Sequence, residues 1–192
     1  LCEYVYGITL ANAVTQRGVY SEREAISVVA SVCNGLKILH QNNIVHRDIN
    51  PNNVMIDSSG CVKIIDYNIS RTVKAHQNRD TEVMGTPGYT APEQFGFQQT
   101  NEKADIYSCG VLLNFLLTGK LPNEQLYQGK LTPVITHCIE LDPNNRYVNI
   151  NHLRAVLVND RRYIKLMGRN EIETMRFRPL PGYRSKRFFP KL

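Results

Sequence analysis

Two short segments of the chain place acidic and amide side chains directly beside apolar runs. Residues 46–53 read His-Arg-Asp-Ile-Asn-Pro-Asn-Asn, with Asp48 five residues before Asn53, and Asp66 follows the mostly apolar residues 62–65. A carboxylate can orient an attacking hydroxyl and accept its proton, while carboxylate and amide oxygens are ligands that magnesium accepts. Taken alone, each segment would also suit an Asx-rich surface turn or an acidic strand end. Together the two segments offer a carboxylate that can accept a proton and oxygen ligands for Mg²⁺.

The elements expected around these segments would place them at strand ends. Ser21 and Glu24 have capping-box spacing, and apolar residues recur at intervals of three and four over residues 21–41, which predicts a helix. Apolar runs at 54–56 and 62–65 flank an Asp-Ser-Ser-Gly turn signal and predict a β-hairpin.

The second half of the chain is expected to be mostly helical. Residues 66–103 lack sustained periodicity and contain several Gly and Pro, which predicts a long functional loop. Residues 105–117 are apolar on most faces and predict a buried helix, because a surface helix keeps a polar face. Smaller helices are expected at 131–140 and 149–158. The expected fold class is therefore mainly α, a helical bundle with one short β-hairpin.

Three motifs resemble those of protein kinases and occur in the order that the family has. Residues 46–53 match the catalytic-loop pattern His-Arg-Asp-x-x-x-x-Asn, and Asp-Tyr-Asn at 66–68 stands where the family has Asp-Phe-Gly. Residues 85–93, Gly-Thr-Pro-Gly-Tyr-Thr-Ala-Pro-Glu, resemble the end of a kinase activation segment. The chain thus resembles the C-terminal lobe of a eukaryotic-type (Hanks-type) serine/threonine protein kinase, a family with bacterial members. The resemblance implies a kinase-like lobe whose β-hairpin carries the catalytic loop.

The resemblance implies roles for the acidic and amide side chains of these motifs. Asp48 would be the catalytic base with Asn50 beside it, and Asn53 and Asp66 would bind Mg²⁺ and, with it, the phosphates of ATP. The acceptors would be serine or threonine hydroxyls of protein substrates, because the Gly-Thr-Pro of the activation segment is similar to the serine/threonine type of acceptor-site loop.

Four further residues would have structural roles by the same resemblance. The glutamate of Ala-Pro-Glu pairs with a distant arginine in the family, which implies a buried ion pair between Glu93 and Arg146. Asp105 opens a segment that resembles the family's Asp-x-Trp-x-x-Gly and would hold the catalytic-loop backbone by hydrogen bonds. His46 would be structural as well.

The start of the chain looks like the interlobe hinge of a kinase. Residues 3–10 would then contact adenine through backbone groups, which makes Glu3 and Val5 candidate ATP-binding residues.

Regulation by phosphorylation is a further expectation. Arg47 directly before Asp48 marks the class in which an arginine reads a phosphate on the activation loop. Thr81 is the candidate phosphorylation site and Thr72 the second candidate, while Thr86 is expected to contact Asp48 in the acceptor site. The alternative is that these threonines are ordinary loop residues.

Some departures from the family pattern bear on activity. Asn50 stands where serine/threonine kinases usually carry Lys, and Asn68 replaces the glycine of Asp-Phe-Gly. No Gly-x-Gly-x-x-Gly loop and no Val-Ala-Ile-Lys strand occur in the sequence, so we expect the N-lobe to be absent and the chain to be an inactive fragment of a longer kinase. A catalytically weak, pseudokinase-like interaction module is the alternative.

The charge distribution divides the chain into two parts, and the cysteines indicate its redox environment. The net charge of +6 lies in the tail, since residues 161–192 hold ten Lys and Arg against two Glu. We therefore expect a kinase C-lobe at 1–158 and a basic tail or juxtamembrane linker at 159–192. The five cysteines include no Cys-x-x-Cys pair, which suits reduced core thiols in a cytoplasmic protein.

The basic tail suggests a partner and a location. Its Lys, Arg and aromatic residues would suit an anionic membrane surface on the cytoplasmic side. A solvated linker is the alternative. A specific nucleic-acid partner is not expected, because the chain shows no recognisable nucleic-acid-binding fold.

Overall fold

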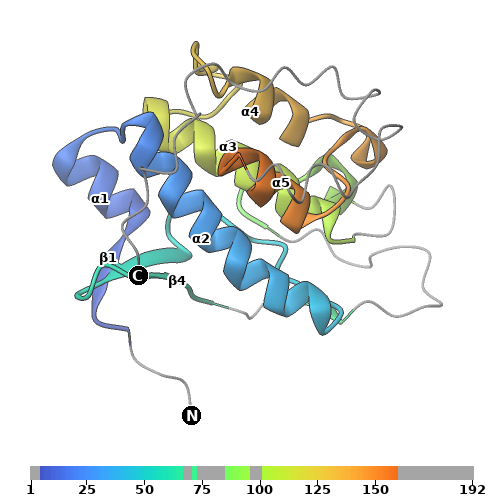
Figure 1. The fold of residues 1–192 in the computed structure, drawn as a ribbon, viewed down its shortest axis with the longest axis horizontal. Coiled ribbons are helices and arrows are strands. Elements are labelled where there is room, and N and C mark those ends of the chain that lie inside the picture. Colours follow the sequence, from blue (N-terminus) through green and yellow to red (C-terminus); the bar gives the residue numbers. More distant parts are fainter. Residues whose placement is uncertain (1–4, 67–70, 73–84, 96–100, 160–192) are drawn as a thin grey trace.

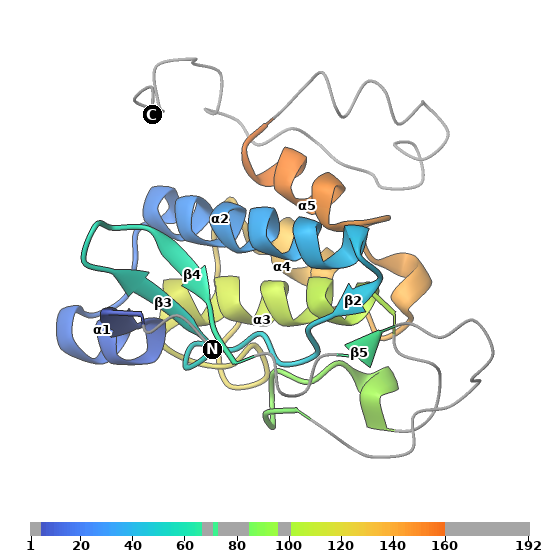
Figure 2. The same cartoon turned by 90° about the horizontal axis from the view of Figure 1, so that it is seen from below.

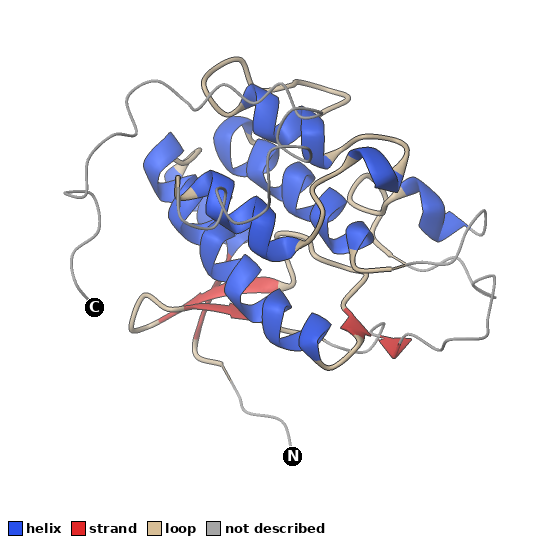
Figure 3. Cartoon of the chain, turned by 45° about the vertical axis from the view of Figure 1, so that its right-hand side comes forward, coloured by secondary structure: helices blue, strands red, loops and turns tan. Residues whose placement is uncertain are grey.

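The computed structural model describes residues 5–66, 71–72, 85–95 and 101–159. Two long helices, α2 (Glu22–Gln41) and α3 (Lys103–Thr118), pack against each other in the centre of the molecule (Figure 2). Helix α5 (Ile150–Leu157) packs on α2, and α4 (Thr132–Cys138) packs on α3. The helices form the body of the molecule, and two small sheets lie along its edge (Figure 3).

Helix α2 forms as the capping-box spacing predicts. The side chain of Ser21 accepts a hydrogen bond from the backbone N–H of Glu24, and the Glu24 carboxylate accepts one from the Ser21 backbone at 2.9 Å. One face of the helix, including Val29, Val32 and Leu36, is fully buried in the core. The helix therefore buries its apolar face in the core. It lies beside α3, as Figure 1 shows.

Helix α3 is the buried helix that residues 105–117 predict, although it begins two residues earlier. Its one buried amide, Asn114, donates to the carbonyls of Lys120 and Gln125 at 2.9 Å and accepts from the backbone N–H of Tyr127 at 2.8 Å. The helix ends at Gly119, whose φ of 73° is the left-handed conformation that glycine adopts most readily. Asn114 thus ties the connection after α3 back onto the helix.

The three-stranded sheet contains one strand that the sequence pattern did not predict. Strands β3 (Val54–Asp57) and β4 (Val62–Ile64) pair antiparallel, and β1 (Gly7–Thr9) adds to the other side of β3. Helix α1 (Leu10–Arg17), also not predicted, follows at once and is capped by the side chain of Thr9. The sheet order β1-β3-β4 joins the start of the chain to the segment after the catalytic loop.

The second sheet has two very short strands. Strand β2 (Ile44–Val45) precedes residues 46–53, and it pairs antiparallel with β5 (Arg71–Thr72). The predicted loop 66–103 thus contains β5 and the 3₁₀ helix η1 (Pro92–Phe95), and its remaining parts lie partly outside the described residues.

The predicted smaller helices are both present, each slightly shorter than expected. Helix α4 replaces the expected 131–140, α5 replaces 149–158, and the short 3₁₀ helix η2 (Pro143–Asn145) lies between them. Among the residues that the structure describes, no helix is long and apolar enough to cross a membrane.

The cysteines follow the expectation of core thiols with one exception. Cys33, Cys109 and Cys138 are buried, and burial raises the pKa of the Cys138 thiol, which keeps it protonated. Cys61 is exposed, so the expectation is wrong there, because this residue lies between the paired strands β3 and β4 rather than in the core. Cys2 lies outside the described residues.

Candidate active site

Asp48 lies at the centre of a cluster of short hydrogen bonds. It belongs to the loop between β2 and β3, and only 9% of its surface is exposed. Its Oδ1 accepts from the hydroxyl of Thr86 at 2.6 Å and from the Thr86 backbone N–H at 3.0 Å. Its Oδ2 accepts from the amide Nδ2 of Asn53 at 2.7 Å. The expected contact between Thr86 and Asp48 is therefore present, and both carboxylate oxygens are held by neutral donors.

Asn50 connects this carboxylate to the activation-segment end. Its Nδ2 donates to the Thr86 hydroxyl at 2.9 Å, and that hydroxyl in turn donates to Asp48. Its Oδ1 accepts the backbone N–H groups of Asn52 at 2.9 Å and Asn53 at 3.3 Å. Asn50 is buried, so it fixes the catalytic loop and Thr86 relative to each other without adding charge.

Asp105 holds the backbone of the loop as expected. Its two carboxylate oxygens accept the backbone N–H groups of His46 at 3.0 Å and Arg47 at 2.8 Å. Arg47 has a φ of 72°, an uncommon conformation for a residue with a side chain. A fully buried carboxylate thus supports a strained turn directly before Asp48.

Two histidines surround this turn. His46 is buried, and its Nδ1 accepts from the backbone N–H of Asp48 at 3.3 Å. Burial lowers the pKa of His46, while the charge of Asp105 opposes that shift. A neutral His46 suits the acceptor role of its Nδ1. His40, which the sequence patterns did not single out, contacts Asp105 Oδ2 through its Nε2 at 2.8 Å.

Asp66 and Asn53 could share a hard cation. The backbone N–H of Ile65 donates to the Asn53 carbonyl at 2.9 Å, so Asp66 follows directly on a residue that is bonded to Asn53. Asp66 is exposed and has a φ of 62°. Because the Nδ2 of Asn53 is engaged by Asp48, its amide oxygen is the atom left for a ligand. A carboxylate and an amide oxygen fit Mg²⁺, which prefers oxygen ligands.

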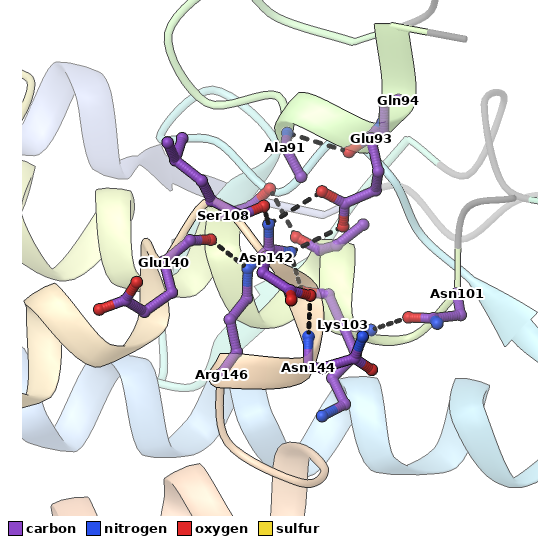
Figure 4. Close-up of polar contacts among 12 residues, drawn as sticks. Ala91, Glu93, Gln94, Asn101, Lys103, Ser108, Glu140, Asp142, Asn144 and Arg146 are labelled. Carbon is purple, nitrogen blue, oxygen red and sulfur yellow. Dashed lines mark hydrogen bonds and ion pairs between the residues drawn. The ribbon is translucent and has the colours of Figure 1, made fainter. Parts of the chain in front are cut away.

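The second cluster is the buried ion pair between Glu93 and Arg146, drawn in Figure 4. The guanidinium of Arg146 donates to both carboxylate oxygens, at 2.7 and 2.9 Å. It also donates to the carbonyls of Glu140 at 2.8 Å and Lys103 at 3.0 Å, and it lies 5.0 Å from the centre of the Tyr107 ring. The pair that the resemblance implied is therefore present, and it joins η1 to the segment before α5 and to the start of α3.

Gln94 is a buried polar residue that the sequence analysis did not single out. It follows Glu93 in η1, and its Nε2 donates to the backbone carbonyl of Arg47 at 2.9 Å. It therefore contacts the catalytic loop directly, whereas Glu93 faces Arg146. A polar residue directly after the Ala-Pro-Glu motif was the only sequence signal that pointed to it.

Some of the expected site residues are not placed. Glu3, Asn68 and Thr81 lie outside the described residues. Val5 lies within them and is half-buried before β1, whereas Thr72 is paired through its backbone with Ile44. The nucleotide-binding and regulatory roles of these residues stay predictions.

Comparisons with known proteins identify the family of this chain. Residues 1–153 match the family model described as "Protein kinase domain". The serine/threonine-protein kinase PknB of Mycobacterium tuberculosis is 32% identical over 182 residues, which cover 81% of this chain and 29% of that protein. The serine/threonine-protein kinase PrkC of Bacillus subtilis is 39% identical over 124 residues, which cover 62% of this chain and 19% of that protein.

The family model covers most of this chain, and the match to PknB also extends over more than two thirds of it. The chain belongs to the protein kinase domain family, in the eukaryotic-type (Hanks-type) form that bacteria carry. It spans less than a third of the length of the curated relatives that it matches.

Proposed function

We propose that the full-length protein is a serine/threonine protein kinase that transfers the γ-phosphoryl group of ATP to protein hydroxyls. The observation that carries this proposal is the contact of Asp48 with Thr86 and Asn53. Three donors orient the carboxylate, and its position beside the activation-segment end is where an acceptor hydroxyl would arrive.

The proposed roles follow from the contacts of each side chain. Asp48 orients the acceptor hydroxyl and takes its proton, and Asn50 and Thr86 keep that carboxylate in place. Asn53 and Asp66 hold Mg²⁺, which when bound neutralises charge on the phosphates of ATP. Asp105 keeps the loop backbone in its strained turn.

Other proposed roles concern the start of the chain and the activation segment. Glu3 and Val5 would contact adenine, and Arg47 would read a phosphate on Thr81. The groups that cover the ATP phosphates in the family would have to come from a further part of the protein, so we propose that this chain alone is inactive.

We also propose a division of the chain near residue 158. The last described helix ends at Leu157, and the residues after 159 carry the excess of positive charge. The basic tail would contact an anionic membrane surface, with the kinase lobe on the cytoplasmic side. Vesicle co-sedimentation with and without the residues 160–192 tests this, and equal binding by both forms would contradict it.

The experiment that tests the proposed function is transfer of radiolabelled phosphate from ATP by the full-length protein and its Asp48→Asn variant. We expect label on serine or threonine with the unaltered protein and at least about 100-fold less with the variant, because the base is lost. Equal labelling by both proteins would exclude Asp48 as the catalytic residue.

One observation favours a second candidate function. Asn50 is neutral where the family usually has Lys, so the described site lacks one positive charge that would face the transferring phosphoryl group. A catalytically weak, pseudokinase-like interaction module would tolerate that loss. Absence of labelling by the unaltered protein, with Mg²⁺-ATP binding retained, would favour this alternative.

A further inference from the structure

Gln94 links two segments that must meet for the proposed chemistry. It lies in η1, at the end of the activation segment, and only 2% of its surface is exposed. Its side chain reaches the loop that carries Asp48, where it contacts Arg47, 47 residues earlier in the sequence. A buried amide of this kind is normally fully hydrogen-bonded, and its partners show what it holds.

Hydrogen bonds at both ends of the Gln94 amide position the side chain. Nε2 donates to the backbone carbonyl of Arg47 at 2.9 Å. Oε1 accepts the backbone N–H of Ala91 at 3.3 Å, a contact that Figure 4 also shows. The Ala91 bond orients the side chain from its own segment, so the nitrogen is directed at the catalytic loop.

With the hydrogen bond from Gln94, the backbone of Arg47 is held at both its N–H group and its carbonyl. The N–H of Arg47 is held by Asp105 at 2.8 Å, and its carbonyl is held by Gln94 at 2.9 Å. The bonds about which φ and ψ of Arg47 rotate connect this N–H group to this carbonyl. The φ of Arg47 is 72°, which is uncommon for a residue with a side chain. Such a conformation persists where surrounding contacts hold it.

We propose that Gln94 is a positioning residue that fixes the Arg47 carbonyl and thereby the direction of Asp48. This inference rests on the proposed kinase function. Asp48 is the next residue in the chain, so a change in the Arg47 backbone moves its carboxylate relative to Thr86 and the acceptor hydroxyl. Misplacement of a catalytic group by about 1 Å can cost on the order of 100-fold in rate.

The test compares two substitutions in the full-length protein. Gln94→Met keeps the volume and removes both hydrogen bonds, and Gln94→Glu keeps the acceptor for Ala91 but removes the donor to Arg47. We expect both to lower kcat about 10-fold to 100-fold with the KM for ATP nearly unchanged. Backbone amide exchange over residues 46–53 should increase in both.

Tyr127→Phe is the matched control. It removes the side-chain hydrogen bond from the Tyr127 hydroxyl to Glu22 at 2.8 Å, which joins the segment after α3 to the first residue of α2. We expect its kcat and its exchange over 46–53 to equal those of the unaltered protein.

The outcomes separate the two proposals. An unaltered protein without transfer activity overturns the proposed function, and the exchange measurement still decides whether Gln94 holds the loop. An active protein whose Gln94 variants keep kcat and show unchanged exchange overturns the positioning role. Exchange that increases equally over the whole chain would show a general structural role and would also overturn it.

Discussion

Two buried carboxylates in this lobe are held in different ways. Glu93 faces a full positive charge, and the guanidinium of Arg146 donates to both of its oxygens. Asp48 is almost as buried, but the donors that reach it among the described residues are neutral, namely Thr86 and Asn53. Removal of the partner of a buried, paired carboxylate destabilises the fold, whereas a carboxylate that only neutral donors orient keeps its charge for an incoming group. On the proposed function, the Glu93–Arg146 pair is an anchor of the fold and Asp48 is the reactive centre.

The largest effect should come from breaking the anchor. Arg146→Met leaves Glu93 buried without its cation and should lower the free energy of unfolding by about 3 to 5 kcal/mol. Urea denaturation measures this loss. Arg17→Met is the matched control, because it breaks an exposed pair with Glu24 and should cost less than about 1 kcal/mol. Similar losses in the two variants would contradict the anchor role.

The next largest effect should come from the reactive centre. Thr86→Val removes the hydroxyl that donates to Asp48 at 2.6 Å while keeping the shape of the side chain. We expect kcat to fall about 10-fold to 100-fold, because the carboxylate loses one of its orienting donors. Thr86→Ser keeps the hydroxyl and should retain most of the activity. Steady-state kinetics check both, and a Val variant as active as the Ser variant would refute the role.

Acid should lower the stability of the fold through protonation of His152. This residue is buried against the ring of Tyr147, and burial lowers the pKa of His152 to about 4, with His137 adding to the shift. Unfolded histidine titrates near 6.5, so the neutral form stabilises the fold fully above that pH, and this contribution is lost as the pH falls toward 4.

Replacement of His152 by Phe should therefore reduce the acid sensitivity of the fold. We expect the unaltered protein to lose about 2 kcal/mol more than His152→Phe between pH 7 and pH 4.5. Urea denaturation at both pH values measures the difference. Parallel losses in the two proteins would show that His152 is not the group that titrates.

The smallest effect should come from adding charge to the reactive centre. Asn50→Lys places a cation beside Thr86 and the transferring phosphoryl group, and we expect kcat to rise about tenfold. Asn52→Lys adds the same charge at an exposed position of the same loop and should change kcat little. An Asn50→Lys variant with unchanged or lower kcat would mean that the hydrogen bonds of Asn50 to Thr86 and to the loop backbone matter more for catalysis than an added charge.

The residues that the sequence identified are those that belong to motifs with fixed spacing. Asp48, Glu93 and Asp105 could be predicted because each stands in a pattern of several residues, and the contacts of all three were expected. Gln94 belongs to no such pattern. Its proposed role depends on the packing of η1 against the catalytic loop. No local sequence pattern predicts a contact between two segments that lie so far apart in the chain.

Short strands were the other features that sequence patterns missed. Strand β1 has only three residues and begins at Gly7, so it has no readable alternation. Strand β5 has only two residues and pairs with β2, which lies far before it in the sequence, so no local pattern predicts this pairing. Long amphipathic or fully apolar segments such as α2 and α3 could be predicted because many residues repeat the same signal.

The most direct test of the account compares Asp48→Asn and Arg146→Met in one experiment that measures phosphoryl transfer per folded molecule and the denaturation midpoint. We predict that Asp48→Asn lowers the rate at least about 100-fold with little change in midpoint, because an oriented carboxylate contributes to chemistry. Arg146→Met should lower the midpoint strongly and affect the rate per folded molecule much less. An Asp48→Asn variant that keeps the rate and loses stability instead would contradict the assignment of Asp48 as the reactive centre.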